Sequence, residues 1–475
     1  MVNDLNCDIA IIGGGAGGLS VAAGAAQLGV KVVLMESSKM GGDCLNAGCV
    51  PSKALLAAAK AQWQARHSEH FGIDGNSIKT NFKAAMQHVH QVINNIAEHD
   101  SVERFEKLGV QVIQDAGKFI NRNTVQADDY QITAKRFVIA TGSSAFVPPI
   151  EGLDSIDYLT NENIFKLNEQ PSHLIVVGGG PIGCELAQAF VMLGSQVTIL
   201  ESFKALPKDE EDCAAIVKEQ LKATGVILHE GVKVNAIVKQ HDGGITVTCE
   251  QKGKALTING SHVLVATGRR ANVQGLDLEK AGINYSAKGI VVDNRLRTSN
   301  KKIFAIGDVT GGFQFTHVAG YHAGVVIKNA LFRLPAKVNY QALPWVTYTE
   351  PELAHVGLLT QEAEKQGLTI TITEWPFFDN DRAQTEGNTQ GKIKILTDKK
   401  ARILGATIVG RHAGDLILPW VMAIREGRTL RSFTDAIAPY PTLSEISKRV
   451  AGDYYTPLLF SEKTRRLVRW LLKLG

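Results

Sequence analysis

Two segments of this 475-residue chain repeat one pattern: an apolar strand, a glycine-rich turn, a helix and a second strand. The first is CDIAIIGGGAGGLSVAAGAAQLGVKVVLMES, in which apolar residues 9–12 precede the three glycines of a G-x-G-x-x-G motif, Gly13, Gly15 and Gly18. Such glycines allow a tight turn and let backbone amides at a helix N-terminus approach a pyrophosphate. Glu36 follows at the end of the second strand, where a carboxylate can bind a ribose. This segment therefore predicts a dinucleotide-binding β-α-β unit.

The second copy is HLIVVGGGPIGCELAQAFVMLGSQVTILES. Its motif glycines are Gly178, Gly180 and Gly183, and Glu201 ends its second strand. Glycines that serve only packing in an α/β crossover would not be expected to appear as two complete copies. Two dinucleotide sites suggest a bound flavin, FAD, and a diffusing nicotinamide. Because Glu201 would repel a 2′-phosphate and no arginine follows it in ESFKALP, NADH is favoured over NADPH.

Three further apolar strands precede small-residue turns, in FVIATGS (137–143), VLVATGRR (263–270) and KIFAIGDVTGG (302–312). We expect these strands to return the chain to a sheet beside each nucleotide site. Asp308, at the end of the third strand, could hold the ribityl hydroxyls of a flavin. The further cofactor-binding residues expected near these turns and in the loop after the first unit are Gly42, Thr141, Gly142, Gly268 and Gly307.

Composition excludes several classes of protein. A hydrophobic content of 44% with 21% charged residues is typical of a soluble globular protein, and the formal net charge of +4 gives no reason to expect nucleic-acid binding. Residues 9–30 lack charge, but seven of them are glycine, which favours a buried β-α unit over a membrane span. The N-terminus shows no signal peptide, and six cysteines are sparse for this length. A cytoplasmic location is expected.

Cys44 and Cys49 lie close together in GGDCLNAGCVPSK. Zinc would require further cysteine or histidine ligands nearby, and a disulfide closing so short a loop would stabilise the fold by only about 2 kcal/mol. Pro51 suits the first turn of a helix, and a cysteine at a helix N-terminus has a depressed pKa. Redox chemistry is therefore the favoured interpretation, and no metal site is predicted. The remaining cysteines are expected to be buried and structural: Cys7, Cys184, Cys213 and Cys249.

The chain contains this cysteine motif, the two dinucleotide fingerprints described above, and the further segments ATGRRAN and IFAIGDV. In these features it resembles the class I flavin disulfide reductases (pyridine nucleotide-disulfide oxidoreductases). Dihydrolipoamide dehydrogenase, glutathione reductase and mercuric reductase belong to this family. The resemblance implies an α/β fold with two Rossmann-like domains and a C-terminal α+β dimerisation domain, assembled as a homodimer. The expected boundaries are 1–155 and 276–345 for the two parts of the FAD domain, 156–275 for the NAD domain, 346–460 for the dimerisation domain and 461–475 for a basic tail.

The resemblance also implies roles for individual residues. Cys49 would be the thiolate beside the flavin, and Cys44 the thiol that meets the acceptor. Lys53 would lie by the flavin N5 and pair with Glu185, where a cation stabilises negative charge on reduced flavin and on Cys49. The same pair can also be interpreted as a structural salt bridge between the two domains, and the two roles are compatible. Asp308 would hold the ribityl chain.

The C-terminal stretch APYPTLSEI departs from the His-Pro-Thr-x-x-Glu motif of dihydrolipoamide dehydrogenases and glutathione reductases. Tyr440 replaces the acid/base histidine, while Glu445 is retained. Tyrosine accepts a proton poorly at neutral pH. Mercuric reductases resemble the chain more closely here, although RWLLKLG lacks a vicinal cysteine pair. The expected activity is electron transfer from NAD(P)H through FAD and the Cys44–Cys49 disulfide to a small-molecule or protein disulfide or a soft metal ion. Dihydrolipoamide dehydrogenase activity is the alternative.

The tail SEKTRRLVRWLLKLG combines helically spaced apolar residues with basic residues on the opposite side. The apolar residues are Leu467, Trp470, Leu471 and Leu474; the basic residues are Arg465, Arg466, Arg469 and Lys473. This pattern indicates either a peripheral contact with an anionic membrane or a membrane partner, at the inner face of the membrane, or a helix packed on its own dimer. A redox-sensing or electron-delivering flavoprotein docked on a membrane partner is therefore an alternative of another functional class.

Overall fold

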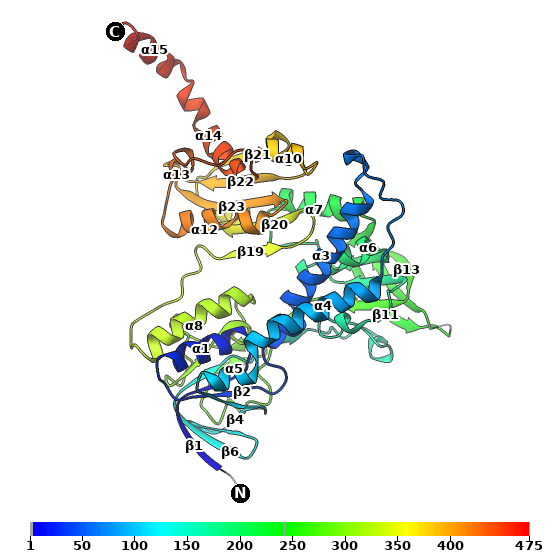
Figure 1. The fold of residues 1–475 in the computed structure, drawn as a ribbon, viewed down its shortest axis with the longest axis vertical. Coiled ribbons are helices and arrows are strands. Elements are labelled where there is room, and N and C mark those ends of the chain that lie inside the picture. Colours follow the sequence, from blue (N-terminus) through cyan, green and yellow to red (C-terminus); the bar gives the residue numbers. More distant parts are fainter. Residues whose placement is uncertain (1–2, 242, 475) are drawn as a thin grey trace. The chain divides into compact units, whose positions relative to one another are not determined.

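The computed structural model describes residues 3–241 and 243–474 of this mixed α/β protein (Figure 1). The chain forms two compact units. The first comprises the residues up to Ser202 together with Gly231–Val338, and the second comprises Phe203–Glu230 together with the residues from Asn339 onward. Within the described ranges, no helix is long and apolar enough to cross a membrane.

The first unit contains a seven-stranded sheet in the order β3-β2-β1-β6-β5-β4, with β18 beside β6. The strands are β1 (Asn3–Ile12), β2 (Val32–Met35), β3 (Val110–Ile113), β4 (Lys118–Asn121), β5 (Thr124–Ala127), β6 (Tyr130–Ile139) and β18 (Ile303–Ala305). The pairs among β1, β2, β3, β6 and β18 are parallel, and continuous apolar runs occur where they meet, as in Ile9–Ile12, Val32–Met35 and Phe137–Ile139. The strand predicted at residues 9–12 is confirmed and begins earlier, at Asn3.

Six helices belong to this part of the first unit: α1 (Ala16–Gln27), α2 (Gly42–Asn46), α3 (Cys49–Arg66), α4 (Phe82–Ala97), α5 (Val102–Lys107) and α8 (Thr316–Ala330). Figure 1 shows α1 and α8 side by side, and the two helices are in contact. The glycine turn between β1 and α1 is thus held between the sheet and a helix that follows some 300 residues later in the sequence.

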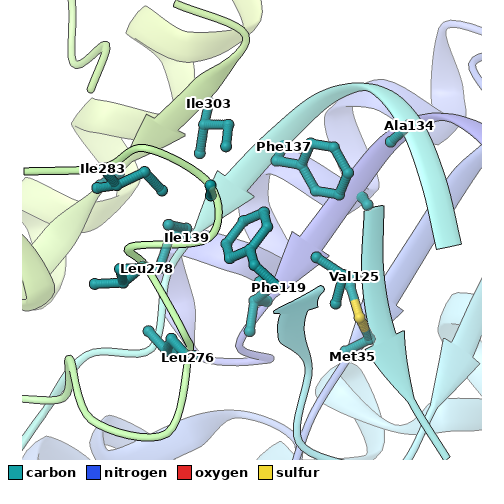
Figure 2. Packing of buried hydrophobic residues seen from close by; sticks show 14 of the residues in the cluster. Met35, Phe119, Val125, Ala134, Phe137, Ile139, Leu276, Leu278, Ile283 and Ile303 are labelled. Carbon is teal, nitrogen blue, oxygen red and sulfur yellow. The ribbon is translucent and has the colours of Figure 1, made fainter. Parts of the chain in front are cut away.

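The core on one side of this sheet joins segments that are far apart in the chain (Figure 2). Phe119 and Phe137 lie with ring centroids 5.5 Å apart, and both rings are buried. Leu276 and Leu278 pack into the same cluster from the segment after the second nucleotide fold. Burying each phenylalanine contributes roughly 1.5–3 kcal/mol. Because Leu276 and Leu278 pack into the same cluster, the later segment is part of the core of the first sheet.

A second parallel sheet carries the repeated motif. Its strands β9 (Gln196–Glu201), β8 (His173–Val177) and β14 (His262–Val265) lie in that order, and α6 (Pro181–Met192) follows β8. An antiparallel sheet is formed by β11 (Val232–Lys239), β12 (Ile245–Gln251) and β13 (Lys254–Gly260). Two short antiparallel pairs complete the unit: β7 (Ser143–Ala145) with β15 (Arg269–Ala271), which are far apart in the chain, and β16 (Tyr285–Ser286) with β17 (Gly289–Ile290), which form a hairpin.

The second unit is built on a five-stranded antiparallel sheet in the order β19-β20-β23-β22-β21. Its strands are β19 (Pro344–Thr347), β20 (Glu352–Gly357), β21 (Thr371–Pro376), β22 (Lys392–Thr397) and β23 (Ile403–Gly410), with β10 (Val226–Glu230) also in this unit. Its helices are α7 (Glu211–Ala223), α9 (Thr360–Lys365), α10 (Asp381–Thr385), α11 (Ala413–Leu416), α12 (Leu418–Arg425), α13 (Arg431–Thr434), α14 (Glu445–Leu459) and α15 (Glu462–Leu471).

An ion network ties the segment around α7 to this sheet. The ammonium of Lys394 on β22 lies 2.8 Å from the carboxylate of Glu210 and 3.0 Å from that of Asp212. Burial acts to lower the pKa of Lys394, but the hydrogen bonds to both carboxylates outweigh it and raise that pKa. The sequence assigns this segment to an NAD domain at 156–275, and that subdivision of the chain stays a prediction.

Candidate functional site

The first glycine turn brings strand, helix and acid together. Gly13 has φ +109°, and a Cβ there would lie 2.4 Å from the carbonyl oxygen of Ala140, so only glycine fits. The next amide, of Gly14, donates a 2.6 Å hydrogen bond to Glu36 Oε2. Gly15 is the N-cap of α1, whose first amides point into the turn. The glycines keep side chains out of this turn, and the amides of the first turn of α1 form a cradle that can bind an anion such as a pyrophosphate.

The second turn has the same geometry at the corresponding residues. Gly178 has φ +113°, and a Cβ there would lie 2.5 Å from the carbonyl oxygen of Ala266. The amide of Gly179 donates a 2.6 Å hydrogen bond to Glu201 Oε2, and Gly180 is the N-cap of α6. The two glycine motifs found in the sequence are thus two equivalent structural cradles, each closed by a carboxylate at the end of the neighbouring strand.

The other expected cofactor residues lie around the first cradle or at the second. Gly18 and Gly183 pack their helices against the turns, Gly42 begins α2 beside Gly15, Thr141 and Gly142 follow β6, and Gly268 follows β14. Gly307 opens a short 3-10 helix, Gly307–Thr310, that contains Asp308. The amide of Gly307 donates to Nδ1 of the buried His322 at 3.1 Å. Burial lowers the pKa of His322 to about 4, so this histidine is a neutral acceptor that fixes the turn.

Asp308 belongs to a polar network that the sequence did not reveal. Ser143 Oγ donates a 2.6 Å hydrogen bond to Asp308 Oδ2, and Arg269 Nε donates to Ser143 Oγ at 2.8 Å. Arg269 also forms a 3.0 Å ion pair with Asp43, the residue before Cys44. Burial raises the pKa of Asp308. One guanidinium therefore links the acid expected at the flavin to the helix that carries the first cysteine.

The two cysteines lie on consecutive helices, of which the sequence predicted only the second. Cys44 lies within α2, and Cys49 is the first residue of α3, with Pro51 in the first turn. Both are free thiols in this structure. Cys49 Sγ lies 3.2 Å from the hydroxyl of Thr316, at the start of α8.

The electrostatics distinguish the two sulfurs. A hydrogen bond from the Cys44 thiol, together with the Thr316 hydroxyl and the charge of Lys53, lowers the pKa of Cys49 to about 6 against the opposing effect of burial. The same hydrogen bond and burial raise the pKa of Cys44. Cys49 is therefore the thiolate at neutral pH, and Cys44 is its hydrogen-bond donor.

Lys53 and Glu185 meet as the sequence predicted. Lys53 Nζ lies 2.7 Å from Glu185 Oε2, and the side chain of Glu185 is almost fully buried on α6. The pair joins the helix of the cysteine motif to the helix of the second glycine motif. It serves as an ion pair between the two nucleotide folds and places a cation one helical turn from Cys49.

An apolar groove borders the cysteine. It has a volume of about 420 Å³ and lies between α3 and α4. Its lining residues are Cys49, Val50, Lys53, Ala54, Ala57, His88, Val92 and Ile96. The neighbouring His90 instead bonds the carbonyl of Phe165 at 2.8 Å, so the two histidines of α4 have different surroundings.

Tyr440 and Glu445 lie in the second unit, each with a partner of its own. The hydroxyl of Tyr440 donates a 3.0 Å hydrogen bond to Asp381, which raises the tyrosine pKa. Glu445 is the first residue of α14 and pairs with Arg449 at 2.8 Å. The raised pKa keeps Tyr440 protonated at neutral pH, so its hydroxyl is a hydrogen-bond donor there and not a proton acceptor.

The remaining cysteine and metal predictions can be compared with the described residues. Cys7, Cys184, Cys213 and Cys249 are buried, as predicted. Among residues 3–241 and 243–474, no group of three or more histidine, cysteine or acidic side chains could hold a metal ion. The two glycine cradles, the carboxylates that close them and the half-buried Asp308 suit FAD and a nicotinamide dinucleotide.

Comparison with known proteins identifies the family. Residues 7–323 match the pyridine nucleotide-disulphide oxidoreductase family, and residues 343–451 match the dimerisation domain of the same family, which indicates a homodimer. The chain is 36% identical to mercuric reductase of Bacillus cereus over 92% of this chain and 70% of that protein. It is 37% identical to dihydrolipoyl dehydrogenase of Geobacillus stearothermophilus over 93% of this chain and 94% of that protein.

Solved structures agree. The Cu(II) complex of the HOCl-induced flavoprotein disulfide reductase RclA from Escherichia coli aligns with a TM-score of 0.84 at 29% identity, over 94% of this chain and 99% of that one. LpdA from Mycobacterium tuberculosis aligns with a TM-score of 0.86 at 26% identity, over 95% and 99%. The chain belongs to the pyridine nucleotide-disulphide oxidoreductase family, whose members bind FAD and NAD(P).

Proposed function

We propose that this protein passes two electrons from NAD(P)H to a Cys44–Cys49 disulfide and from the resulting dithiol to an external disulfide or soft metal ion. The observation that carries the proposal is the low-pKa sulfur of Cys49, which accepts a hydrogen bond from Cys44. FAD, when bound, supplies the two-electron relay between the nicotinamide and the disulfide. Its pyrophosphate would be held by the first cradle, its ribityl chain by Asp308.

The residues of the chain account for the proton and electron balance. Two electrons break the S–S bond and leave Cys49 as a thiolate and Cys44 as a thiol after uptake of one proton. The dithiol then returns two electrons to the acceptor, which either splits into two thiols or, as Hg²⁺, becomes elemental mercury. Lys53 would stabilise negative charge on Cys49, and its partner Glu185 would hold the ammonium in position.

We propose NADH as the preferred donor. Glu201 closes the second cradle by its bond to the Gly179 amide, and a carboxylate there binds a free ribose but repels a 2′-phosphate. Exchanging Glu201→Arg is expected to raise kcat/KM for NADPH at least about tenfold and to lower it for NADH. Glu36→Gln in the first cradle is the matched control, because it alters an equivalent carboxylate without changing donor preference.

A soft metal ion is the acceptor that the second unit supports best. Tyr440 donates to Asp381 and cannot easily carry a proton for thiol exchange, whereas a soft metal ion that binds Cys49 and Cys44 displaces the remaining thiol proton to solvent and is reduced without protonation of a leaving thiolate. A mercuric reductase is among the relatives, and one solved relative is a Cu(II) complex. The apolar groove beside Cys49 supports the alternative, a dihydrolipoamide dehydrogenase activity on a disulfide with an apolar arm.

A comparison of acceptors tests the proposal. Rates with Hg²⁺, lipoamide and glutathione disulfide would be measured for the wild-type holoenzyme, Cys44→Ser and Val92→Asp. We expect Cys44→Ser to lose turnover of every acceptor, and Val92→Asp to affect lipoamide but not Hg²⁺. Wild-type activity that survives in Cys44→Ser would contradict the proposal. NADH oxidation with no thiol-dependent acceptor would instead favour a redox-sensing or electron-delivering role.

We extend the proposal to the organisation of the molecule. The FAD domain would comprise 1–155 and 276–345, and the core shared by Phe137 and Leu276 supports joining these two parts. The NAD domain would be 156–275 and the dimerisation domain 346–460. A cytoplasmic location is proposed from the sparse cysteines and the dependence of the chemistry on reducible thiols.

A further inference from the structure

The last helix, α15 (Glu462–Leu471), lies outside both family matches, the second of which ends at residue 451. It follows α14 at the end of the described chain (Figure 1). Ser461 caps it, accepting a 3.3 Å hydrogen bond from the Thr464 amide. No residue of α15 is buried. The side chains of α15 are therefore not part of the core of the second unit.

The apolar side chains of this helix are exposed to an unusual degree. Leu467 is 53% exposed, Trp470 57% and Leu471 50%, and all three share one face at helical spacing. Leu458, Leu459 and Phe460 at the end of α14 are also each more than half exposed. Large apolar side chains gathered in this way indicate a surface that is covered in the functional state.

The opposite face of α15 is basic. It carries Arg465, Arg466 and Arg469, and Glu462 alone supplies a negative charge, within 3.6–3.7 Å of two of these arginines. Residues 461–475 hold five of the chain's 51 Lys/Arg and one of its 47 Asp/Glu. The rest of the chain has 46 of each, so its formal net charge is zero. The entire formal positive excess of the protein resides in this short segment.

We propose that α15 binds the surface of an anionic lipid bilayer, lying in the interface with Leu467, Trp470 and Leu471 toward the acyl chains and the arginines toward the headgroups. Each cation near such a surface contributes about 1 kcal/mol, and the apolar face adds its own transfer free energy. A ten-residue helix is about 15 Å long, half of the roughly 30 Å needed to span a bilayer. The contact is therefore peripheral.

Other occupants fit less well. A nucleic acid would engage the basic face and leave the apolar face exposed. A second copy of α15 packed on the apolar face would bring two strongly basic segments together. The remainder of a partner subunit has no net charge to attract them. Lys463 lies on the apolar face itself, four residues before Leu467, and its long side chain can extend the ammonium to the headgroups.

Co-sedimentation of the full-length holoenzyme with vesicles tests this proposal. We expect binding to phosphatidylglycerol/phosphatidylcholine vesicles at low salt, and at least fivefold less binding to pure phosphatidylcholine or in 0.5 M salt. Arg465→Glu/Arg469→Glu and Leu467→Gln/Leu471→Gln should each lose binding. Lys399→Glu/Lys400→Glu, an equal charge change in an exposed turn, and Leu368→Gln/Ile372→Gln, an equal loss of exposed apolar surface, are the matched controls and should bind as wild type does.

The outcomes separate this proposal from the enzymatic one. NADH oxidation by the tail variants should stay at the wild-type rate, so loss of turnover in them would indicate a folding or catalytic defect. Absence of vesicle binding by the wild type would overturn the proposal, as would equal binding of the tail variants and their controls. A change of oligomeric mass in Leu467→Gln/Leu471→Gln without vesicle binding would assign the helix to a second copy of the chain instead.

Discussion

Lys53 Nζ on α3 lies 2.7 Å from Glu185 Oε2 on α6, so a single ion pair connects the helix of the cysteine motif with the helix of the second glycine motif. The carboxylate is almost fully buried, while the ammonium is partly exposed beside Cys49. The ion pair connects the two nucleotide folds, and it also holds a positive charge close to the sulfur of Cys49. The role of each partner can be separated by substitution.

Replacing Lys53→Met should raise the pKa of Cys49 by about one unit, because an opposite charge nearby stabilises the thiolate. At pH 7 the thiolate fraction should then fall about twofold, from about nine-tenths to about one half, and dithiol oxidation should slow to a similar extent. Alkylation kinetics across pH measure the shift. Lys83→Met, on the exposed side of α4, is the control and should leave the midpoint unchanged. An unchanged midpoint in Lys53→Met would show that this charge does not act on Cys49.

The reduced enzyme should react with iodoacetamide at Cys49 with a midpoint near pH 6, because hydrogen bonding from Cys44 lowers that pKa from 9.0. Thiolate is the reactive form, so the rate should rise through this midpoint and be nearly maximal at pH 7. Cys44→Ala removes the thiol donor and Thr316→Val removes a hydroxyl donor, and each should move the midpoint upward. Mass spectrometry of the alkylated peptide identifies the residue. A wild-type midpoint near 8.5 would contradict the assignment.

Converting Tyr440→His should increase lipoamide reduction about tenfold or more, since a positioned acid/base typically contributes 10²–10⁴-fold. The gain should follow the titration of a histidine near pH 6.5. Tyr440→Phe is the matched control: it removes the hydrogen bond to Asp381 without adding a base and should not gain activity. Equal lipoamide turnover by wild type and Tyr440→His would show that the tyrosine is no obstacle.

The nucleotide folds could be predicted from the sequence because their turns demand glycine for steric reasons. Gly13 and Gly178 each face a carbonyl oxygen too close for a side chain, and each is followed by a carboxylate that accepts an amide hydrogen bond. The start of α3 was also predictable, since Pro51 fits only the first turn. Each of these features depends on a few residues that are neighbours in the sequence, so it could be predicted from local pattern.

Contacts between distant residues could not be predicted from local pattern, and the Lys53–Glu185 pair was expected only from the resemblance to the family. β1 starts at Asn3 rather than Ile9 because its first residues pair with the first half of β6, which begins at Tyr130. Arg269 lies in the segment VLVATGRR, but nothing in the sequence indicates that it binds Asp43, 226 positions away. The partner of Tyr440 on α10 was likewise hidden. Such contacts follow from the packed fold and not from local pattern.

Counting thiols before and after anaerobic reduction tests the central claim most directly. The oxidised holoenzyme would be treated with one equivalent of NADH, denatured, and its free thiols titrated and mapped. The account predicts two additional thiols per chain, located at Cys44 and Cys49, and no gain in Cys44→Ser or Cys49→Ser. A flavin-loaded enzyme that consumes NADH without gaining thiols at these two positions would contradict it.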